Sequence, residues 1–484
     1  MKKVLLIVIC LTFVFCLSAC HTDSDELDLS QYRIVIPENA DISTKYASES
    51  LANELEDRLG IRPSIVNDTE SETEFEILIG ETNRDASKTT TSLGKNEFLL
   101  FKSDEKLVLK GEGIYIGAPC SALLNQYSKI ENNTFILNKL PTKEKALTFS
   151  FSDKCENVIF MIGDGMGNNH ITMSEKSRGF EFVARQFPSL GWSITRSQSV
   201  INLEAGYTDS AASGTAMSTG YKTINGYVGL DKDGNKLLNV RELAHSLGAK
   251  TAVLTTDLIT GATPSAYMCH NISRNNTEEL QAEINSLISN NKIDFCKGEV
   301  WDDLTTETKI ALDTISRDNS SFFIMIEEAY TDKCSHNNDY AGVVDAVVRF
   351  NDAIAYATQF TFMHPSTALI VTADHETGRL TKYQTMPDYE YTFGSYNHTN
   401  ENVPIFALGA ETEFFNEKTV ENIELAKFTA RAYSQSPFGQ SLDTLSLNKK
   451  EADVAIIQNK KQKFLGNFCF FNMLIFFYPL QPPA

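Results

Sequence analysis

Two blocks of alternating apolar runs and helical patterns organise this chain. In the first block, the apolar run at residues 32–37 predicts a strand, and residues 45–59 repeat their apolar positions at helical spacing before Gly60, a natural C-terminal cap. Further patterns predict strands over 75–79, 97–102 and 106–109 and a helix over 119–127. The block at residues 30–150 is therefore predicted to be a small α/β domain.

The second block begins after a charged, loosely patterned linker at about residues 141–157. Its apolar run at residues 158–162 is continuous rather than alternating, as in a parallel strand that is buried on both faces. Similar runs predict strands over 253–256, 321–326, 367–371 and 403–408, with helical patterns over 238–247 and 340–360 between them. This alternation predicts an α/β fold, with a central, mostly parallel sheet flanked by helices over residues 151–440.

Polar side chains accumulate where these predicted strands end. Taken singly, each is more commonly a solvated side chain or a satisfied core group than a ligand. Their convergence at one sheet edge changes that balance, because open α/β sheets bind ligands there. Carboxylates together with imidazoles suit Zn²⁺, whereas an all-oxygen site suits Mg²⁺. The candidate zinc ligands are Asp164, Asp332, His336, Asp374, His375 and His398, and the all-oxygen candidates are Asp164, Glu327 and a hydroxyl.

A run of very small residues at 206–216 places the Ser210 hydroxyl beside the Asp209 carboxylate. A helix that starts there would present unpaired N–H groups to an anion, so Ser210 is a candidate nucleophile. The alternative is a packing helix in which Asp209 or Ser210 is only the N-cap.

Composition narrows the possible partners. The chain has 484 residues, of which 42% are hydrophobic, and this indicates two or more globular domains. The formal net charge of -20 argues against nucleic-acid binding, which depends on clustered Lys and Arg. The acidic excess includes carboxylates that could bind cations.

The two ends of the chain do not follow the pattern of the domains. Residues 1–19 resemble a bacterial lipoprotein signal peptide, because two lysines and an apolar run precede Leu-Ser-Ala-Cys. Cleavage there would leave Cys20 to carry the lipid, with residues 20–29 as a tether, so we expect an extracytoplasmic protein anchored to a bacterial membrane. A plain transmembrane helix is less favoured because the run is short. Residues 441–484 turn Lys-rich and then aromatic, and we expect a poorly ordered tail.

Five motifs in the second block resemble the alkaline phosphatase family. They are "IGDGMG", "TDSAASGTA", "GATPSAYMCHNISR", "TADHETG" and "NHTNENVPIFALG", and they occur in the family's order over about residues 155–410. The resemblance implies a phosphoserine nucleophile at Ser210 and a phosphate-gripping Arg274. It also implies one zinc held by Asp332, His336 and His398, a second held by Asp164, Asp374 and His375, and a magnesium held by Asp164, Thr263 and Glu327.

This sequence departs from the family pattern at Gly261, where many relatives carry an Asp or His that supports the hydration shell of the magnesium. The two zincs are therefore expected more firmly than the magnesium. The segments between Arg274 and Ser321 and between Gly378 and His398 are also short, where larger relatives insert a surface subdomain. If this chain forms a homodimer, we expect its contacts to come from surfaces other than such a subdomain.

A looser resemblance concerns residues 30–130. The stretches "LANELEDRLG", "EILIGETNR" and "GEGIYIGAPCSALLNQY" are similar to an accessory domain that precedes the catalytic barrel of several bacterial glycoside hydrolases. That domain carries no catalytic residues, which implies a scaffold or docking role here.

These features predict an extracytoplasmic, metal-dependent hydrolase of phosphate monoesters. Its nearest rival is a phosphodiesterase or sulfatase of the same superfamily, although Arg274, Thr263 and Glu327 favour monoesters. A rival of another class is a catalytically silent surface lipoprotein that binds glycans or phosphate.

Overall fold

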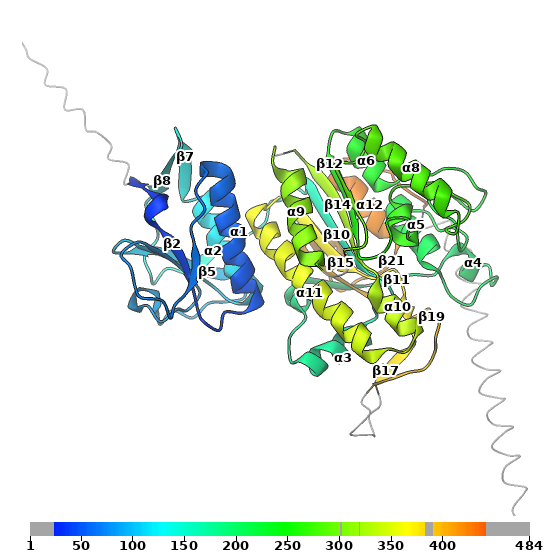
Figure 1. The fold of residues 1–484 in the computed structure, drawn as a ribbon, viewed down its shortest axis with the longest axis horizontal. Coiled ribbons are helices and arrows are strands. Elements are labelled where there is room, and N and C mark those ends of the chain that lie inside the picture. Colours follow the sequence, from blue (N-terminus) through cyan, green and yellow to red (C-terminus); the bar gives the residue numbers. More distant parts are fainter. Residues whose placement is uncertain (1–23, 301–302, 319, 383–390, 442–484) are drawn as a thin grey trace, which may run out of the picture.

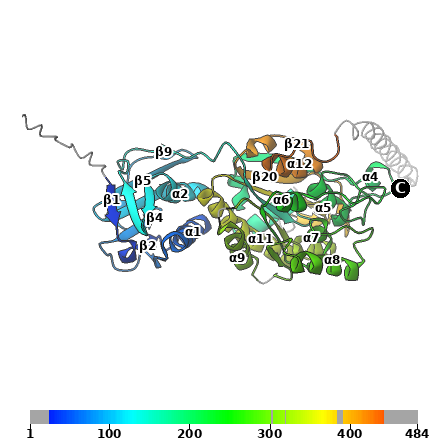
Figure 2. The same cartoon turned by 90° about the horizontal axis from the view of Figure 1, so that it is seen from above.

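The computed structural model describes residues 24–300, 303–318, 320–382 and 391–441. The predicted signal peptide, the Cys20 acylation site and nearly all of the predicted tail lie outside these residues. Figure 1 shows two α/β units side by side, and Figure 2 shows them from a perpendicular direction. Within the described ranges, none of the helices is both long and apolar enough to cross a bilayer.

The N-terminal unit is built on a six-stranded sheet. Its order is β3 (Ile65–Asn67), β2 (Arg33–Ile36), β4 (Glu76–Ile79), β6 (Lys106–Gly111), β5 (Glu97–Ser103) and β9 (Leu147–Thr148). The first four strands are parallel, and β5 and β9 are antiparallel to their neighbours. A three-stranded sheet of β1 (Ser24–Leu27), β8 (Thr134–Asn138) and β7 (Ser128–Glu131) is added. Strand β9 lies inside the predicted linker, which therefore contributes to this unit.

Two helices cover one face of this sheet, α1 (Ile42–Leu59) and α2 (Gly117–Asn125). Helix α1 ends as the sequence predicts, because Gly60 adopts the left-handed conformation with φ of 69°. It begins three residues earlier than the apolar pattern, because the Asp41 side chain accepts a hydrogen bond from the Thr44 N–H and acts as the N-cap. Capping rather than apolar spacing therefore fixes the start of this helix.

The C-terminal unit is built on an eight-stranded sheet. Its order is β13 (Phe295–Lys297), β12 (Lys250–Thr255), β14 (Phe322–Glu328), β10 (Asn157–Gly163), β15 (Thr367–Thr372), β20 (Val403–Gly409), β11 (Ser189–Ile194) and β21 (Thr419–Glu421). The first five strands are mutually parallel, whereas β20 is antiparallel to both of its neighbours. The predicted mostly parallel α/β sheet is confirmed.

Helices cover both faces of this sheet, and the continuous apolar strands reflect this. Along β10, Ile159 and Met161 join the core on one face, whereas Val158, Phe160 and Ile162 join the core on the other. One face carries α3 (Asn168–Arg178), α9 (Leu304–Ser316) and α11 (Tyr340–Met363), and the other carries α5 (Ser210–Thr219), α6 (Val240–Ser246), α8 (Thr277–Ser289) and α12 (Ile423–Ala432). Both side-chain directions of each central strand are therefore buried.

Shorter elements complete the edge of the sheet where the candidate residues lie. They are α4 (Gln198–Ile201), α7 (Ala262–Ala266), α10 (Tyr330–His336), the pair β16 (Glu376–Thr377) with β19 (His398–Thr399), and the pair β17 (Leu380–Lys382) with β18 (Tyr391–Phe393). The β16–β19 pair brings His398 beside the segment that follows β15.

The two units share one continuous apolar core, which runs from α1 and α2 into α11. At the junction the rings of Tyr46 and Tyr356 meet edge to face with centroids 5.8 Å apart. Beside them, Lys309 Nζ lies 2.5 Å from a carboxylate oxygen of Glu49. The N-terminal unit is thus packed against helix α11 of the C-terminal unit.

Candidate metal centre and active site

Three neighbouring parallel strands bring the predicted ligands to one edge of the sheet. Strand β10 lies between β14 and β15, and its Ile162 is paired with Glu327 on one side and with Thr372 on the other. The chain segments that follow these strands carry Asp164, Asp332 with His336, and Asp374 with His375. Residues far apart in the sequence therefore meet because their strands end together.

A glycine makes this close approach possible. Gly165 follows Asp164 with φ of 69°, in the left-handed region that favours glycine. A Cβ atom built on it would lie 2.8 Å from the Asp332 Cα and 2.7 Å from the Thr377 Oγ1. The absence of a side chain at Gly165 therefore allows the "IGDGMG" turn to lie against the segments that carry Asp332 and Thr377.

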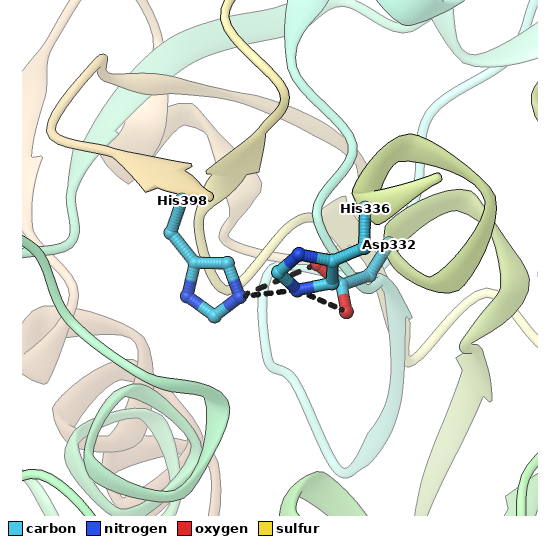
Figure 3. A group of neighbouring side chains, drawn as sticks. All are labelled: Asp332, His336 and His398. Atoms are coloured by element: carbon cyan, nitrogen blue, oxygen red, sulfur yellow. Dashed lines mark hydrogen bonds and ion pairs between the residues drawn. The ribbon is translucent and has the colours of Figure 1, made fainter. Parts of the chain in front are cut away.

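The first group of donors consists of Asp332, His336 and His398 (Figure 3). The two Nε2 atoms of the histidines lie 3.0 Å apart, and the carboxylate oxygens of Asp332 lie 3.3 and 3.4 Å from them. The Nδ1 atoms contact the carbonyl oxygens of Tyr396 at 2.5 Å and Thr208 at 2.8 Å. A carbonyl only accepts hydrogen bonds, so both Nδ1 atoms are protonated, and both Nε2 atoms point to the Asp332 carboxylate. In the neutral rings each Nε2 would offer a lone pair to a cation at this point. A divalent cation would satisfy this arrangement.

The second group centres on His375. Thr377 donates its hydroxyl proton to Asp332, so its Oγ1 accepts a hydrogen bond from His375 Nδ1 at 3.2 Å. The His375 Nε2 then has a free lone pair, and it lies 3.2 Å from Asp374 Oδ2 and 3.6 Å from Asp164 Oδ1. Burial lowers the pKa of His375 well below its usual value, which keeps the ring neutral.

The carboxylates of this centre repel one another. Burial raises the pKa of Asp164 well above its usual value, and the charges of Asp374 and Asp332 add to the effect. Burial and Asp332 likewise raise the pKa of Asp374 to about 6. In contrast, hydrogen bonds from His336 and His398 outweigh burial and hold the pKa of Asp332 well below its usual value.

The two carboxylates with raised pKa values also carry oxygen atoms without hydrogen-bond partners. Asp164 Oδ1 and Asp374 Oδ2 are buried, and neither has a hydrogen-bond partner among the described residues. Donor atoms of Asp164, Asp332 and His375 all lie within 4.8 Å of one another. The prediction grouped Asp374 rather than Asp332 with this histidine, and the structure places both carboxylates beside it. The donor set therefore fits two closely spaced divalent cations of the zinc type.

Glu327 and Thr263 are the other predicted magnesium ligands, and the charge of Glu327 acts on Asp164. The Glu327 carboxylate accepts a hydrogen bond from Thr255, and burial with the nearby charge of Asp257 raises its pKa to about 8. The Thr263 hydroxyl is close enough to favour the ionised form of Glu327, but the geometry falls short of a hydrogen bond and leaves Thr263 Oγ1 without a partner among the described residues. This oxygen-rich group fits Mg²⁺.

The structure also separates Glu327 from its neighbour. Because side chains alternate along a strand, Glu328 points to the opposite face, where Arg349 donates two hydrogen bonds to it at 2.8 and 3.0 Å. Glu328 is therefore neutralised inside the core, which supports the choice of Glu327 as the ligand.

Ser210 is the first residue of α5, and Asp209 is the N-cap whose carboxylate accepts from the Ala212 N–H at 3.0 Å. All ten residues of α5 are buried, and the helix packs mainly against α7 and α12. The Ser210 Oγ lies 3.2 Å from His375 Nε2. Helix α5 is therefore a buried packing element that also carries the candidate nucleophile at its first position.

Asp209 also positions Arg274. Its Oδ2 accepts hydrogen bonds from Arg274 Nη1 at 3.3 Å and from the Gly226 N–H at 3.0 Å. The positive charge of Arg274 favours the ionised form of Asp164 and the neutral form of His375, so the guanidinium is close enough to act on both. Asp209 therefore orients the arginine, and its hydrogen bonds leave it poorly placed to act as a base.

Some contributors were not identified from the sequence. Thr377 connects His375 to Asp332 through its hydroxyl, and Asp257 approaches Glu327 from the turn after β12. Thr377 lies inside the "TADHETG" motif, which was the available signal, whereas nothing in the sequence marks Asp257. His170 lies outside both donor groups, because its ring is buried and contacts the Gly167 N–H and the Ser335 hydroxyl.

Comparison with known proteins identifies the family of this chain. The family model described as "Alkaline phosphatase" matches residues 155–303 and 299–396. Alkaline phosphatase 4 of Bacillus subtilis (strain 168) is 28% identical over 343 residues, which are 58% of this chain and 72% of that protein. The alkaline phosphatase of Escherichia coli (strain K12) is 38% identical over 138 residues, which are 27% of this chain and 29% of that protein.

Solved structures show the same fold. The alkaline phosphatase from the Antarctic bacterium TAB5 aligns over 58% of this chain and 99% of its own, with a TM-score of 0.53 and 25% identity. A variant of that enzyme with Mg bound in the M3 site aligns with a TM-score of 0.52 and 26% identity, over 60% of this chain and 99% of its own.

The fold and the clustered donors define a hydrolase of the alkaline phosphatase superfamily. Within it, the chain belongs to the alkaline phosphatase family, a family that binds zinc and magnesium.

Proposed function

We propose that this protein hydrolyses phosphate monoesters through a phosphoserine intermediate on Ser210. The observation that carries the proposal is the placement of Ser210. Its hydroxyl stands at the N-terminus of the buried helix α5, 3.2 Å from His375 Nε2, in a centre on which the charge of Arg274 acts. The helix N-terminus adds a partial positive charge that favours a bound phosphate.

The residues present would hold the metal ions as the donor sets suggest. One zinc would bind Asp332, His336 and His398, a second would bind Asp164, Asp374 and His375, and a magnesium would bind Asp164, Thr263 and Glu327. When bound, these ions would activate the Ser210 hydroxyl and neutralise charge on the phosphoryl oxygens.

The chain's own groups then define the reaction. Ser210 Oγ attacks phosphorus in line with the P–O bond of the ester, the alcohol leaves with that oxygen, and water later breaks the serine phosphate to release inorganic phosphate. Arg274 has a planar fork that can grip two nonbridging oxygens. Because Asp209 fixes Arg274 at 3.3 Å, this grip is arranged before substrate arrives.

Monoesters are favoured over diesters and sulfates by the same groups. A diester would have to place its second substituent where Arg274 and the group of Thr263 and Glu327 crowd the phosphate. A phosphodiesterase or sulfatase of the same superfamily is the second candidate. A catalytically silent lipoprotein that binds glycans or phosphate is disfavoured by the complete donor set and by Ser210.

Location is a separate part of the proposal. The Leu-Ser-Ala-Cys sequence supports lipid attachment at Cys20 and residence outside the cytoplasm, on a bacterial membrane. Incorporation of a labelled fatty acid tests this, because the label is expected in the parent protein and absent from Cys20→Ala. Equal labelling of both proteins would contradict it.

The catalytic test compares a chromogenic phosphate monoester with the matching diester and sulfate ester, in the presence of Zn²⁺ and Mg²⁺. The parent protein is expected to prefer the monoester, and Ser210→Ala is expected to lose at least about 10³-fold in kcat, since the nucleophile is removed. Ser218→Ala, in the same helix but bonded to the Ala266 carbonyl, is the matched control and should keep its activity.

Two outcomes would contradict the proposal. Preference for the diester or the sulfate would favour the second candidate. Equal turnover by the parent and Ser210→Ala would remove Ser210 from the mechanism.

A further inference from the structure

The sequence has a glycine at position 261, where the family resemblance implies an Asp or His, and the structure shows which group lies beside it. Gly261 is the N-cap of α7, the short helix that carries Thr263. A Cβ atom built on Gly261 would lie 3.0 Å from Asp257 Oδ2 and 3.0 Å from the Leu258 carbonyl oxygen. The Asp257 carboxylate therefore occupies the space into which a side chain at 261 would project.

The backbone holds Asp257 in this position. Its N–H donates to the Thr255 Oγ1 at 2.9 Å, and the same hydroxyl donates to Glu327. Its carbonyl accepts from the Glu299 N–H at 2.6 Å. A Cβ at Gly298 would lie 2.8 Å from that carbonyl, so the two chain segments are in close contact. The turn after β12 is thus fixed relative to the Glu327 carboxylate.

The two oxygens of Asp257 face different groups. Its Oδ1 forms an ion pair with Nζ of Lys333, the residue that follows the zinc-ligand candidate Asp332. Its Oδ2 faces the space in front of Gly261. The Asp257 side chain is 25% exposed and that of Lys333 is 40% exposed. Water can therefore reach this side of the site, and Mg²⁺ characteristically keeps several of its waters.

A second observation points to a ligand here. The Thr263 Oγ1 is buried, with Thr263 only 1% exposed, and it has no hydrogen-bond partner in the described part of the chain. The Thr263 hydroxyl also acts on Glu327, whose carboxylate is buried at the end of β14. Buried oxygens without partners are expected when an ion normally occupies the site.

We propose that Asp257 replaces the missing side chain at position 261 as the outer carboxylate of the magnesium site. In this role its Oδ2 holds a water of the bound Mg²⁺, and its Oδ1 fixes Lys333 beside the zinc centre. Asp257 is a positioning residue, because it acts through the ion and through Lys333. The inference rests on the proposed metal sites, but not on which ester the enzyme hydrolyses.

The experiment measures magnesium binding directly. Full-length protein loaded with Zn²⁺ and freed of Mg²⁺ is titrated with MgCl₂ in a calorimeter, and zinc content is measured in parallel. Asp257→Asn is expected to weaken magnesium affinity by about 10–100-fold, as loss of an outer carboxylate does in other metal sites, with zinc content unchanged. Asp233→Asn is the control, because Asp233 is an exposed partner of Lys232.

A rescue variant separates ligand support from simple structural support. Gly261 has φ of −55°, which any residue can adopt, and Asp257→Ala removes one of the two atoms that crowd a Cβ there, so Gly261→Asp requires only that the Leu258 carbonyl oxygen at 3.0 Å shift slightly. In combination with Asp257→Ala it is expected to regain most of the magnesium affinity that Asp257→Ala alone loses. Melting temperature without magnesium is recorded for every variant, and Asp257→Asn is expected to melt like the parent.

Three results would overturn the inference. They are unchanged magnesium affinity in Asp257→Asn, absence of magnesium binding in the parent, and a loss of melting temperature without magnesium that accounts for the whole effect. Failure of the proposed phosphatase activity would look different, because magnesium binding would still depend on Asp257 while the monoester was not hydrolysed.

Discussion

Two groups of buried acidic side chains, one in each α/β unit, differ in how their charge is balanced. In the N-terminal unit, Glu76 is fully buried and surrounded by cations, with Arg33 at 2.7 Å, Arg84 at 3.1 Å and Lys106 at 3.3 Å. Burial alone would raise the pKa of Glu76, but the hydrogen bonds from the two arginines outweigh it and lower that pKa to about 2. This group is complete within the protein.

The catalytic group has the opposite character. Asp164 and Asp374 lie close to the charge of Asp332, and the pKa values of Asp164 and Asp374 are raised. One carboxylate oxygen of Asp164 and one of Asp374 lack a hydrogen-bond partner among the described residues. Burying a charge is costly unless it is paired. The comparison shows two ways to balance buried negative charge. The carboxylate of Glu76 is neutralised by cationic side chains of the protein and serves stability, whereas the carboxylates that lack such partners fit the binding of a metal cation.

The largest expected effect comes from Asp332, because it contributes to both groups of metal donors. Asp332→Ala is expected to lower kcat/KM for a phosphate monoester by about 10²–10³-fold and to reduce the bound zinc. Activity assays and zinc analysis check this. The control is Asp345→Asn, an exposed carboxylate on α11 that pairs with Arg178. Full zinc content in Asp332→Ala would contradict the assignment.

The next largest effect is a loss of stability when the buried carboxylate of Glu76 is removed from its cationic partners. Glu76→Gln leaves the buried Arg84 with only neutral partners and is expected to cost about 3–5 kcal/mol of unfolding free energy. Urea unfolding measures the loss, and turnover per folded molecule should not change. Glu74→Gln, two residues away on the surface, is expected to stay within about 0.5 kcal/mol of the parent. A comparable loss in both variants would show that the buried pairing is unimportant.

The two groups are also expected to give opposite pH dependence in metal-free protein. Glu327 has a folded pKa of about 8 against an ordinary value of 4.5, so the folded state binds more protons in that window and stability falls as pH rises through it. Glu76 has a folded pKa of about 2, so its stabilisation is lost as pH falls from about 4.5 towards 2.

Melting temperatures between pH 2 and 9 check these signs. Metal-free protein is expected to be most stable near the middle of this range, Glu76→Gln should flatten the acid side, and Zn²⁺ with Mg²⁺ should flatten the alkaline side. If Zn²⁺ and Mg²⁺ left the decrease of melting temperature at alkaline pH unchanged, the carboxylates of the candidate metal centre would not be its cause.

The smallest expected effect is that of Lys106→Met. Glu76 keeps both arginines in this variant, and the lost pair is the longest of the three at 3.3 Å. The expected loss is about 1 kcal/mol or less by urea unfolding. A loss as large as that of Glu76→Gln would mean that the lysine, rather than the arginines, balances the buried charge.

Much of the architecture could be predicted from apolar patterning. Continuous apolar runs identified the central strands, since only a strand buried on both faces reads that way, and Gly60 marked the end of α1. Local patterning did not reveal β9 inside the expected linker or the antiparallel direction of β20, because strand pairing depends on distant segments. The continuous core that joins the two units was equally invisible to it.

The sequence by itself determined the chemistry available to this protein. Its five ordered motifs contain Ser210 and most of the candidate metal ligands, and the departure at Gly261 is visible without a structure. Only the tertiary structure decided which groups meet there. The carboxylate of Asp257 lies in the space in front of Gly261, and the Thr377 hydroxyl donates a hydrogen bond to Asp332. Glu328 points to the other face of the sheet and accepts hydrogen bonds from Arg349. Residue identity fixes what a side chain can bind, but strand pairing and turn geometry fix what lies within its reach.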